Sequence, residues 1–400
     1  MRMSVLGTRS YRRALEEMRT YLGTCLGWDS IPSSSAFAQA RRKLTPEACV
    51  EVFQGIRERL TRARAVPRVL FHGLRLVAFD GTRLTLPPTQ ELAVTFGCPL
   101  NQHAQPAACP QAGLVVLWDI SSNQPRAWKL GPYAMAERAA AVSLLPSIGS
   151  GDLLLADRGY PGLGFFAEVQ ATGAAFIIRM NTTTVAKSPE FAAFLASGSC
   201  DQGVEFAPRP AATQRFPGTA LLRIRFVADP ANRHRVLATN LLDAAVYPAT
   251  DILRIYPARW NIETAFREGK QWHGLEQFHA LYPEGIHQEI AAIMTFQYLV
   301  SELEADVRAK IHDEIQASTQ PPEASNDIPY TFNRLLMGDM CIRLFLLAAI
   351  KPQDINAEWA RCVRELWRGR QRKRPNRSFP RIAKNPRSIT KATRPTRSTS

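Results

Sequence analysis

Cysteine pairs of the kind that hold zinc are missing from this 400-residue sequence. Its seven cysteines form no C-x-x-C pair and no Cys/His ligand spacing; they stand at positions 25, 49, 98, 109, 200, 341 and 362. Their odd number and wide scatter are typical of reduced thiols in a cytosolic protein, most of them small core residues. We therefore expect no zinc-type site.

Long apolar runs are missing as well. The first residues, Met1 to Ser4, form no apolar signal core, and no segment reaches the length of a membrane span. We expect a cytoplasmic protein that has no membrane partner. Because 46% of its residues are hydrophobic, the chain can still bury a large interior, and its length predicts two or three domains. No internal repeat is apparent.

Acidic residues are absent from one end of the chain. Residues 368–400 hold 12 Lys or Arg and no acid, whereas residues 1–70 hold 13 Lys or Arg against 6 acids. The whole chain carries +15, so the segment between the two ends is net −4. Basic ends around a slightly acidic middle predict ends that bind nucleic acid and a middle that holds cations. A disordered solubilising segment is the alternative for residues 368–400.

One stretch carries four functional side-chain types at fixed spacing. Read as a helix, it places Tyr256, Arg259, Glu263 and Lys270 within a sector of about 60°. A neighbouring apolar stripe predicts that this helix docks on a sheet; its members are Ile255, Ala258, Ile262, Ala265, Phe266 and Gly269. Taken alone, such a polar stripe is more often a solvated face with an Arg259–Glu263 pair.

Two more carboxylates follow apolar runs. The run 74–79 leads to Asp80-Gly81-Thr82 and then to alternating residues 83–86, which predicts a strand, a turn and a paired strand. Residues 152–156 predict a buried strand ending in Asp157. From the residues alone, Asp80 could be plain turn chemistry, and Asp157 could cap a helix that begins near Pro161.

The rest of the pattern predicts an α/β protein. N-cap signals at Ser33–Ser35 and at Thr45, with Pro46 at the first helical position, mark two of three helices in residues 1–70. That basic region is either a helix-turn-helix DNA reader or a packing module with basic outer faces. A hairpin is expected at 113–130, a helix at 136–145, strands at 174–180, 220–227 and 235–241, and helices at 286–311 and 332–350.

The spacing of Tyr256, Arg259, Glu263 and Lys270 resembles the signature of the insertion sequence 4 family of bacterial transposases, which are DDE recombinases. The strings 79–82 (Phe-Asp-Gly-Thr) and 157–160 (Asp-Arg-Gly-Tyr) resemble the family's first and second Asp motifs, and 374–377 (Arg-Pro-Asn-Arg) resembles its C-terminus. The resemblance implies a ribonuclease H-like catalytic core that is interrupted by a β-rich insertion and flanked by a helical domain and a basic tail.

The family pattern also implies a division of the chain. Residues 1–70 would form a helical basic DNA-binding domain. Residues 71–181 would be the first part of the core, 182–240 the β insertion domain, and 241–350 the second part of the core, with the Glu263 helix and the helices after it. Residues 351–400 would form a C-terminal helix and the basic tail.

As a function, the resemblance implies a transposase that cuts DNA at insertion-sequence ends and transfers the freed strand to a target, by a cut-and-paste route. Its catalytic residues would be Asp80, Asp157 and Glu263, which would hold two Mg²⁺ ions, with Mn²⁺ as a substitute. Residues Tyr256, Arg259 and Lys270 would contact DNA. The partners would be double-stranded DNA, both terminal inverted repeats and target, and a second copy of the chain in the synaptic complex. The protein would be associated with the bacterial nucleoid.

Two alternatives stay open. A ribonuclease H-like nuclease that cuts DNA without joining it would need the same carboxylates. A transposase-derived DNA-binding protein that is no longer catalytic would need none of them. The excision route is open too, because relatives receive a flipped base on a Trp of the insertion, and residues 129–259 contain no Trp. Phe206, Phe216 or Tyr247 would have to replace it.

Overall fold

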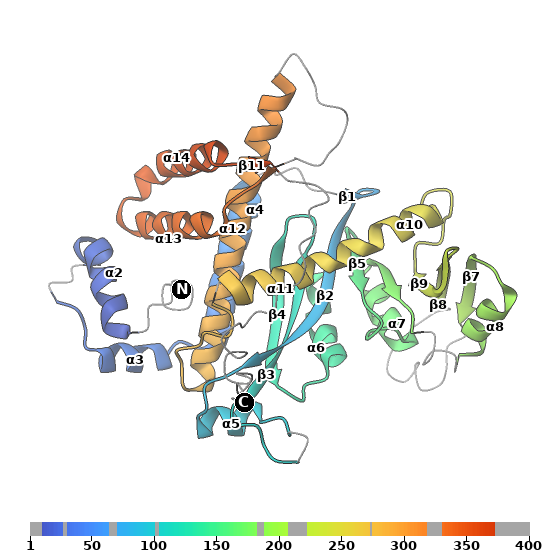
Figure 1. The fold of residues 1–400 in the computed structure, drawn as a ribbon, viewed down its shortest axis with the longest axis horizontal. Coiled ribbons are helices and arrows are strands. Elements are labelled where there is room, and N and C mark those ends of the chain that lie inside the picture. Colours follow the sequence, from blue (N-terminus) through green and yellow to red (C-terminus); the bar gives the residue numbers. More distant parts are fainter. Residues whose placement is uncertain are drawn as a thin grey trace, which may run out of the picture.

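The structure is a computed structural model that describes residues 10–26, 30–63, 70–100, 104–181, 188–206, 222–272, 274–317 and 330–372. Its centre is one mixed sheet of nine described strands in the order β4-β3-β2-β5-β6-β9-β8-β7, with β1 beside β2 (Figure 1). These strands are β1 (Leu70–Phe71), β2 (Leu74–Thr85), β3 (Gln111–Asp119), β4 (Gln124–Pro132), β5 (Asp152–Ala156), β6 (Ala175–Arg179), β7 (Asp201–Phe206), β8 (Leu222–Asp229) and β9 (Asn232–Thr239). The predicted α/β class is confirmed, since a large mixed sheet is combined with helices.

Strand β2 joins the antiparallel part of the sheet to its parallel part. It pairs antiparallel with β3 along most of its length and parallel with β5 from Arg75 to Ala78. Strand β5 in turn pairs parallel with β6, and β6 pairs antiparallel with β9. The strands β7 to β9 therefore continue the central sheet beyond β6.

The sheet separates two hydrophobic cores. Along β2, Leu76 and Ala78 belong to one core, whereas Val77 and Phe79 belong to the other. This alternation follows from the period of two in a strand. The first core is covered by α5 (Gln90–Phe96), α11 (Trp260–Trp272) and the N-terminal half of α12 (Pro283–Ala317). The second is covered by α6 (Glu137–Leu144), α7 (Leu163–Ala171) and α8 (Pro189–Ser197).

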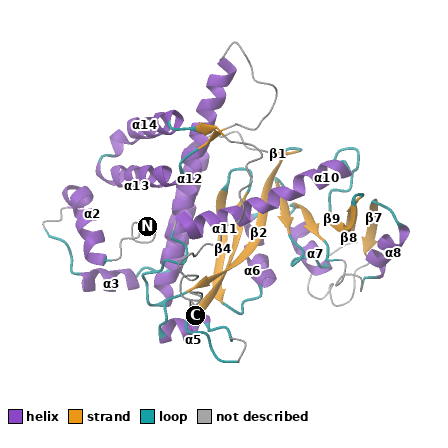
Figure 2. Cartoon of the chain, in the orientation of Figure 1, coloured by secondary structure: helices purple, strands orange, loops and turns teal. Residues whose placement is uncertain are grey.

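The long helix α12 joins the sheet to further helices, and α13 (Arg334–Ile350) and α14 (Ile355–Arg368) lie beside it in Figure 2. Helix α4 (Pro46–Ala63) runs along it, and the buried Phe53 of α4 packs edge-on against Trp128 of β4 and Tyr298 of α12. Helices α13 and α14 form a third core with the C-terminal half of α12. The small strands β10 (Tyr330–Thr331) and β11 (Gln371–Arg372) pair beside them.

Local capping signals predicted the N-terminal helices correctly. Ser33 caps α3 (Ser34–Arg42), where its hydroxyl accepts a hydrogen bond from the Ala36 amide at 3.1 Å. Thr45 accepts one from Ala48 at 3.2 Å ahead of α4. Helix α2 (Tyr11–Leu26) precedes both.

Among the helices that the structure describes, none has the length and apolarity to cross a bilayer. The string 374–377 and the rest of the expected basic tail from residue 373 lie outside the described residues.

The turn predicted at Asp80-Gly81 is wrong. Strand β2 continues without a break from Leu74 to Thr85, and Asp80 pairs with Val116 of β3 in its middle. Gly81 has no left-handed backbone angle. A Cβ atom on Gly81 would lie 2.7 Å from Cδ of Glu137, so the glycine provides room for a side chain from α6. This is a requirement of packing between elements and not of a local turn.

Candidate active site

Asp80 and Asp157 lie at the same level of two neighbouring strands. The parallel ladder between β2 and β5 ends at the pair Ala78–Leu155, and each aspartate follows two residues later. Strand β5 stops at Ala156, so Asp157 comes directly after the strand, where β2 has lost its neighbour on that side. By alternation, Asp80 shares the sheet face of Leu76 and Ala78, which is the face covered by α11.

The Asp80 carboxyl lies in a half-buried and crowded setting. Burial raises its pKa to about 7, and the charges of Glu137 and Glu263 act in the same direction. The Gly81 amide, which donates to Oδ1 at 3.0 Å, and the charge of Arg259 oppose that rise in pKa. Two like charges therefore act on one half-buried acid, which is the arrangement of a cation site or of a general acid.

Asp157 does not cap the following helix. Its Oδ1 atom accepts a hydrogen bond from the Gly159 amide at 2.8 Å, within the loop that leads to Tyr160. Helix α7 begins at Leu163, and its N-cap residue, Gly162, makes no side-chain cap. The carboxylate is half-buried and fixed by its own loop.

The expected signature helix is a succession of three elements, α10 (Ala249–Ile255), the 3-10 turn η3 (Tyr256–Arg259) and α11. The change at Tyr256 coincides with Pro257, which lacks a backbone N–H and so cannot continue the α-helical ladder. Tyr256 and Arg259 thus lie in a tighter turn than Glu263. The predicted docking stripe is confirmed, because Ile262 and Ala265 are buried against the sheet.

Glu263 is held by Arg259. The Arg259 Nη2 atom lies 2.8 Å from Oε1 of Glu263, and the arginine side chain is only 7% exposed. Burial would lower the pKa of Arg259, but its bond to Glu263 and the charges of Tyr256, Glu263 and Asp80 raise it. Its guanidinium also lies over the Trp260 ring, 5.0 Å from the centroid, while its Nε atom is buried without a hydrogen-bond partner. The Arg259 cation therefore pairs with Glu263 inside the protein, and its charge also interacts with that of Asp80.

Tyr256 is buried, and its hydroxyl donates to the Ala156 carbonyl at 3.3 Å. Ala156 is the residue before Asp157, so the phenol holds the end of β5.

Lys270 is more accessible than Tyr256, with 31% of its side chain exposed. Its Nζ atom donates to the Arg83 carbonyl at 2.9 Å and lies 3.1 Å from Glu276.

The structure thus brings Asp80, Asp157 and the Arg259–Glu263 pair to one end of the β2–β5 ladder. In the part of the chain that it describes, no three acidic, His or Cys side chains stand close enough to hold a metal ion as they lie. Only Oε1 of Glu263 is bonded to Arg259 among the contacts described, and a carboxylate has a second oxygen that can bind a cation.

Sequence reasoning missed a fourth carboxylate, Glu137, the first residue of α6. It accepts a hydrogen bond from the Tyr160 hydroxyl at 2.5 Å and lies against Gly81. Nothing in the local sequence distinguishes Glu137 from an ordinary acid in the first turn of a helix. Its partners, Gly81 and Tyr160, stand in the two Asp motifs, and that would have been the one available signal.

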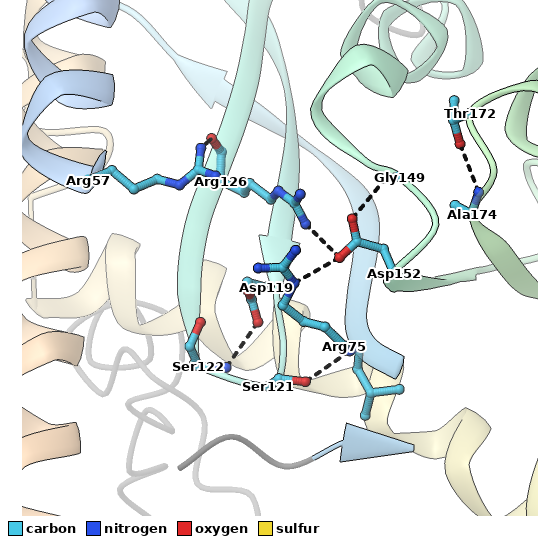
Figure 3. Close-up of polar contacts among 11 residues, drawn as sticks. Arg57, Arg75, Asp119, Ser121, Ser122, Arg126, Gly149, Asp152, Thr172 and Ala174 are labelled. Carbon is cyan, nitrogen blue, oxygen red and sulfur yellow. Dashed lines mark hydrogen bonds and ion pairs between the residues drawn. The ribbon is translucent and has the colours of Figure 1, made fainter. Parts of the chain in front are cut away.

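A second polar network fixes the start of β5, five residues before Asp157. The buried Asp152 carboxylate accepts hydrogen bonds from Arg75 at 2.8 Å, Arg126 at 2.9 Å and the Gly149 amide at 3.0 Å (Figure 3). Burial would raise the pKa of Asp152, but these two arginines outweigh it and lower the pKa below its usual value. The network ties β2, β4 and β5 together beneath the candidate site.

Known proteins are similar to this chain in sequence. A family model for the transposase DDE domain matches residues 71–298, more than half of the chain. The chain is 28% identical over 271 residues to the transposase InsG for insertion sequence element IS4 of Escherichia coli (strain K12). That match spans 66% of this chain and 60% of the relative, which is less than two thirds of the relative's length. The chain is also similar to a cryo-electron microscopy structure of the piggyBac transposase synaptic complex with hairpin DNA, with TM-score 0.39, 9% identity, and coverage of 74% of this chain and 57% of that one.

Proposed function

This chain belongs to the DDE-domain transposases, and its similarity to the transposase of element IS4 confirms the expected insertion sequence 4 family; from this premise we propose that it catalyses metal-dependent DNA cleavage and strand transfer at insertion-sequence ends. Water would attack a phosphodiester at the element end, and the bond to the 3′ oxygen would break. The freed 3′ hydroxyl would then attack a target phosphodiester and release a second 3′ oxygen. We propose the cut-and-paste form of this sequence.

The observation that carries the proposal is the level at which Asp80 and Asp157 lie, two residues beyond the last pair of the β2–β5 ladder. Helix α11 covers the same sheet face and contributes Glu263, whose charge acts on Asp80. Carboxylates from three separate elements at this end of the ladder support a catalytic site. We propose these three residues as the catalytic acids.

The donor chemistry of the site fits Mg²⁺ or Mn²⁺. Carboxylate oxygens are the ligands that these hard cations take, and the negative charges of Glu137 and Glu263 around the half-buried Asp80 favour a cation beside it. We propose that Asp80, Asp157 and Glu263 hold two such ions, which when bound would activate the attacking oxygen and stabilise the leaving one. Glu263 would offer its second oxygen to such an ion, and the neighbouring Arg259 guanidinium would be placed to pair with a phosphate.

We assign DNA contacts to Arg259 and Lys270, and to Tyr256 if its hydroxyl leaves Ala156. Arg259 adjoins the carboxylates and is suited to a phosphate near the cut. Lys270 lies seven residues beyond Glu263, about 10 Å along the helix, and is suited to the next phosphate.

The aromatic residues that could receive a flipped base include Phe206 and Phe216. Phe206 is buried in the core, and Phe216 lies outside the described residues.

The strand pattern supports a ribonuclease H-like core. Strands β4, β3 and β2 are antiparallel neighbours, β5 and β6 continue parallel to β2, and α6 connects β4 to β5 through the short turn η1 (Leu145–Ser147). We retain the division at residues 70, 181, 240 and 350 as part of the proposal, with the strands of segment 182–240 joined to the core sheet through the β6–β9 pairing. The partners we propose are duplex DNA, as terminal repeats and as target, and a second copy of the chain, in the bacterial cytoplasm at the nucleoid.

The direct test is cleavage of a labelled duplex that carries the terminal sequences flanking this gene, in Mg²⁺ buffer. We expect the wild-type protein to cut it and Glu263→Gln to bind it without cutting. Glu91→Gln is the matched control, because it removes the charge of an exposed glutamate from another helix, α5. It should cut like the wild type.

Equal cutting by Glu263→Gln and the wild type would refute the assigned site. Binding without cutting by either protein would favour a DNA-binding protein that is no longer catalytic. A pre-cut duplex with a free 3′ hydroxyl separates the remaining alternative, because a transposase joins it to a target duplex and a nuclease does not.

A further inference from the structure

We propose that Glu137 is a positioning residue of the carboxylate site: it joins the strand that carries Asp80 to the loop that carries Asp157, and so sets the separation of the two aspartates. This inference rests on the proposed function, since it concerns the same site. Glu137 belongs to α6, on the opposite sheet face from Glu263, and stands in neither Asp motif.

The first contact of Glu137 is with β2. Residue 81 follows Asp80, so its missing side chain would point to the α6 face, opposite to Asp80. A Cβ atom there would lie 2.7 Å from Cδ, 3.0 Å from Cγ and 3.0 Å from Oε2 of Glu137. The glutamate side chain therefore lies directly against the strand backbone next to Asp80, in the space that only glycine leaves.

The second contact is with the Asp157 loop. The Tyr160 hydroxyl donates to Oε1 of Glu137 at 2.5 Å, a length typical of a charge-assisted bond. Tyr160 is 1% exposed, and its ring stacks on Phe79 of β2 and packs against Phe165 of α7. Its amide also donates to the Asp157 carbonyl at 3.3 Å. These contacts fix the Tyr160 ring, so its hydroxyl can bond the Glu137 carboxylate in only one position.

The two contacts together link the segments that carry the aspartates. Beyond Ala78–Leu155 the described ladder between β2 and β5 has ended, so backbone pairing no longer sets their separation there. One glutamate side chain touches residue 81 and bonds residue 160, which are one and three residues from the two acids. Groups that orient metal ligands from behind typically change metal affinity or activity by about 10- to 100-fold when removed.

Two variants break this link in different ways, and Mn²⁺ is the probe. Tyr160→Phe removes the hydroxyl and keeps the ring that packs on Phe79 and Phe165. Glu137→Ala removes the carboxylate from a residue that is largely exposed. Glu137→Gln keeps an oxygen acceptor for Tyr160. The control is Glu190→Gln, because Glu190 also lies in the first turn of a helix and accepts a hydroxyl bond, from Ser188 at 2.6 Å.

Binding is measured on the full-length protein without DNA, from the electron paramagnetic resonance signal of free Mn²⁺, and thermal unfolding of each variant is followed in parallel. We expect Glu137→Ala and Tyr160→Phe to bind Mn²⁺ about 10-fold more weakly than the wild type. Glu137→Gln should lie between the wild type and Glu137→Ala, and Glu190→Gln should match the wild type. Raising the Mn²⁺ concentration should restore DNA cutting by the two weakened variants.

Unchanged Mn²⁺ affinity in both Glu137→Ala and Tyr160→Phe would overturn the inference. So would a loss in Glu137→Gln as large as in Glu137→Ala while Tyr160→Phe binds normally, since the charge alone would then matter. If the wild type binds Mn²⁺ through Asp80 yet cuts no DNA, the proposed function fails while the weakened binding of the variants still supports the inference. If the wild type cuts DNA and the variants bind Mn²⁺ normally, only the inference fails.

Discussion

Asp80 and Asp157 follow the last pair of the parallel β2–β5 ladder, Ala78 and Leu155, at the same distance of two residues. A parallel ladder advances both strands in the same direction, so two residues beyond one pair bring both carboxylates to the same level. The alternation of side chains then directs Asp80 toward the face that α11 covers. The register of one short ladder therefore sets the level at which both aspartates lie.

Replacing Gly81 tests the packing at this level. Gly81→Ala places a methyl group 2.7 Å from Cδ of Glu137, so the glutamate side chain must leave its place against the strand. Because Glu137 is exposed and flexible, we expect a loss of at most about 1 kcal/mol in the free energy of unfolding, together with a large loss of DNA cutting. Urea denaturation and the cleavage assay measure the two effects.

Gly203→Ala is the matched control, because Gly203 also lies within a strand, β7, and a Cβ atom there would meet nothing within 4 Å. It should keep both stability and cutting. A Gly81→Ala protein with wild-type cutting and wild-type stability would contradict the close approach of Glu137.

Replacing Asp152 tests the network beneath the site. Asp152→Asn leaves Arg126 and Arg75 beside a neutral group, and we expect a loss of about 3–5 kcal/mol in the free energy of unfolding near pH 7. Because the folded pKa of Asp152 is lowered, its stabilisation is present above the unfolded value of about 3.9 and disappears as the pH falls through the folded value. The difference between wild type and variant should therefore shrink below about pH 4.

Denaturant unfolding at several pH values between neutral and acidic measures this difference. Asp339→Asn, at an exposed position of α13, is the control and should change stability little at any of them. A difference between wild type and Asp152→Asn that stays constant down to the lowest pH would contradict the lowered pKa.

The sequence predicted features that depend on neighbouring residues and missed those that depend on distant ones. The caps at Ser33 and Thr45 were predicted correctly because each hydroxyl bonds an amide three residues away. The same local reasoning took Gly81 for a turn, since no local signal reveals that Glu137 occupies the space above it. The break at Pro257 was visible in the sequence, but the regular spacing of the motif outweighed it.

The candidate site depends on a different kind of signal, namely short motif strings. These strings single out Asp80, Asp157 and Glu263, and the structure brings the segments that carry them to one end of a ladder. The pairing of Glu263 with Arg259 was visible as an i, i+4 spacing. Burial of Tyr256 was not, because its partner Ala156 lies 100 residues away.

Replacing Tyr256 with Phe separates two roles for its hydroxyl. In the structure the hydroxyl donates to the Ala156 carbonyl in the interior, so Tyr256→Phe should lower the free energy of unfolding by about 1 kcal/mol. Affinity for the DNA ends should stay near that of the wild type, as measured by gel shift. The reverse result, weaker DNA binding at unchanged stability, would show that the hydroxyl turns outward to DNA.

Replacing Lys270 tests the most accessible cation of the signature. Its bonds to the Arg83 carbonyl and to Glu276 lie at a surface where ion pairs contribute little, so Lys270→Met should leave stability nearly unchanged. If Lys270 contacts a phosphate, the slope of log affinity against log salt concentration should become shallower by about 1. Lys129→Met, at an exposed position of β4, removes the same charge elsewhere and is the control. Equal slopes for both variants would mean that Lys270 serves only to hold Arg83 and Glu276, because general loss of charge would then explain any change in affinity.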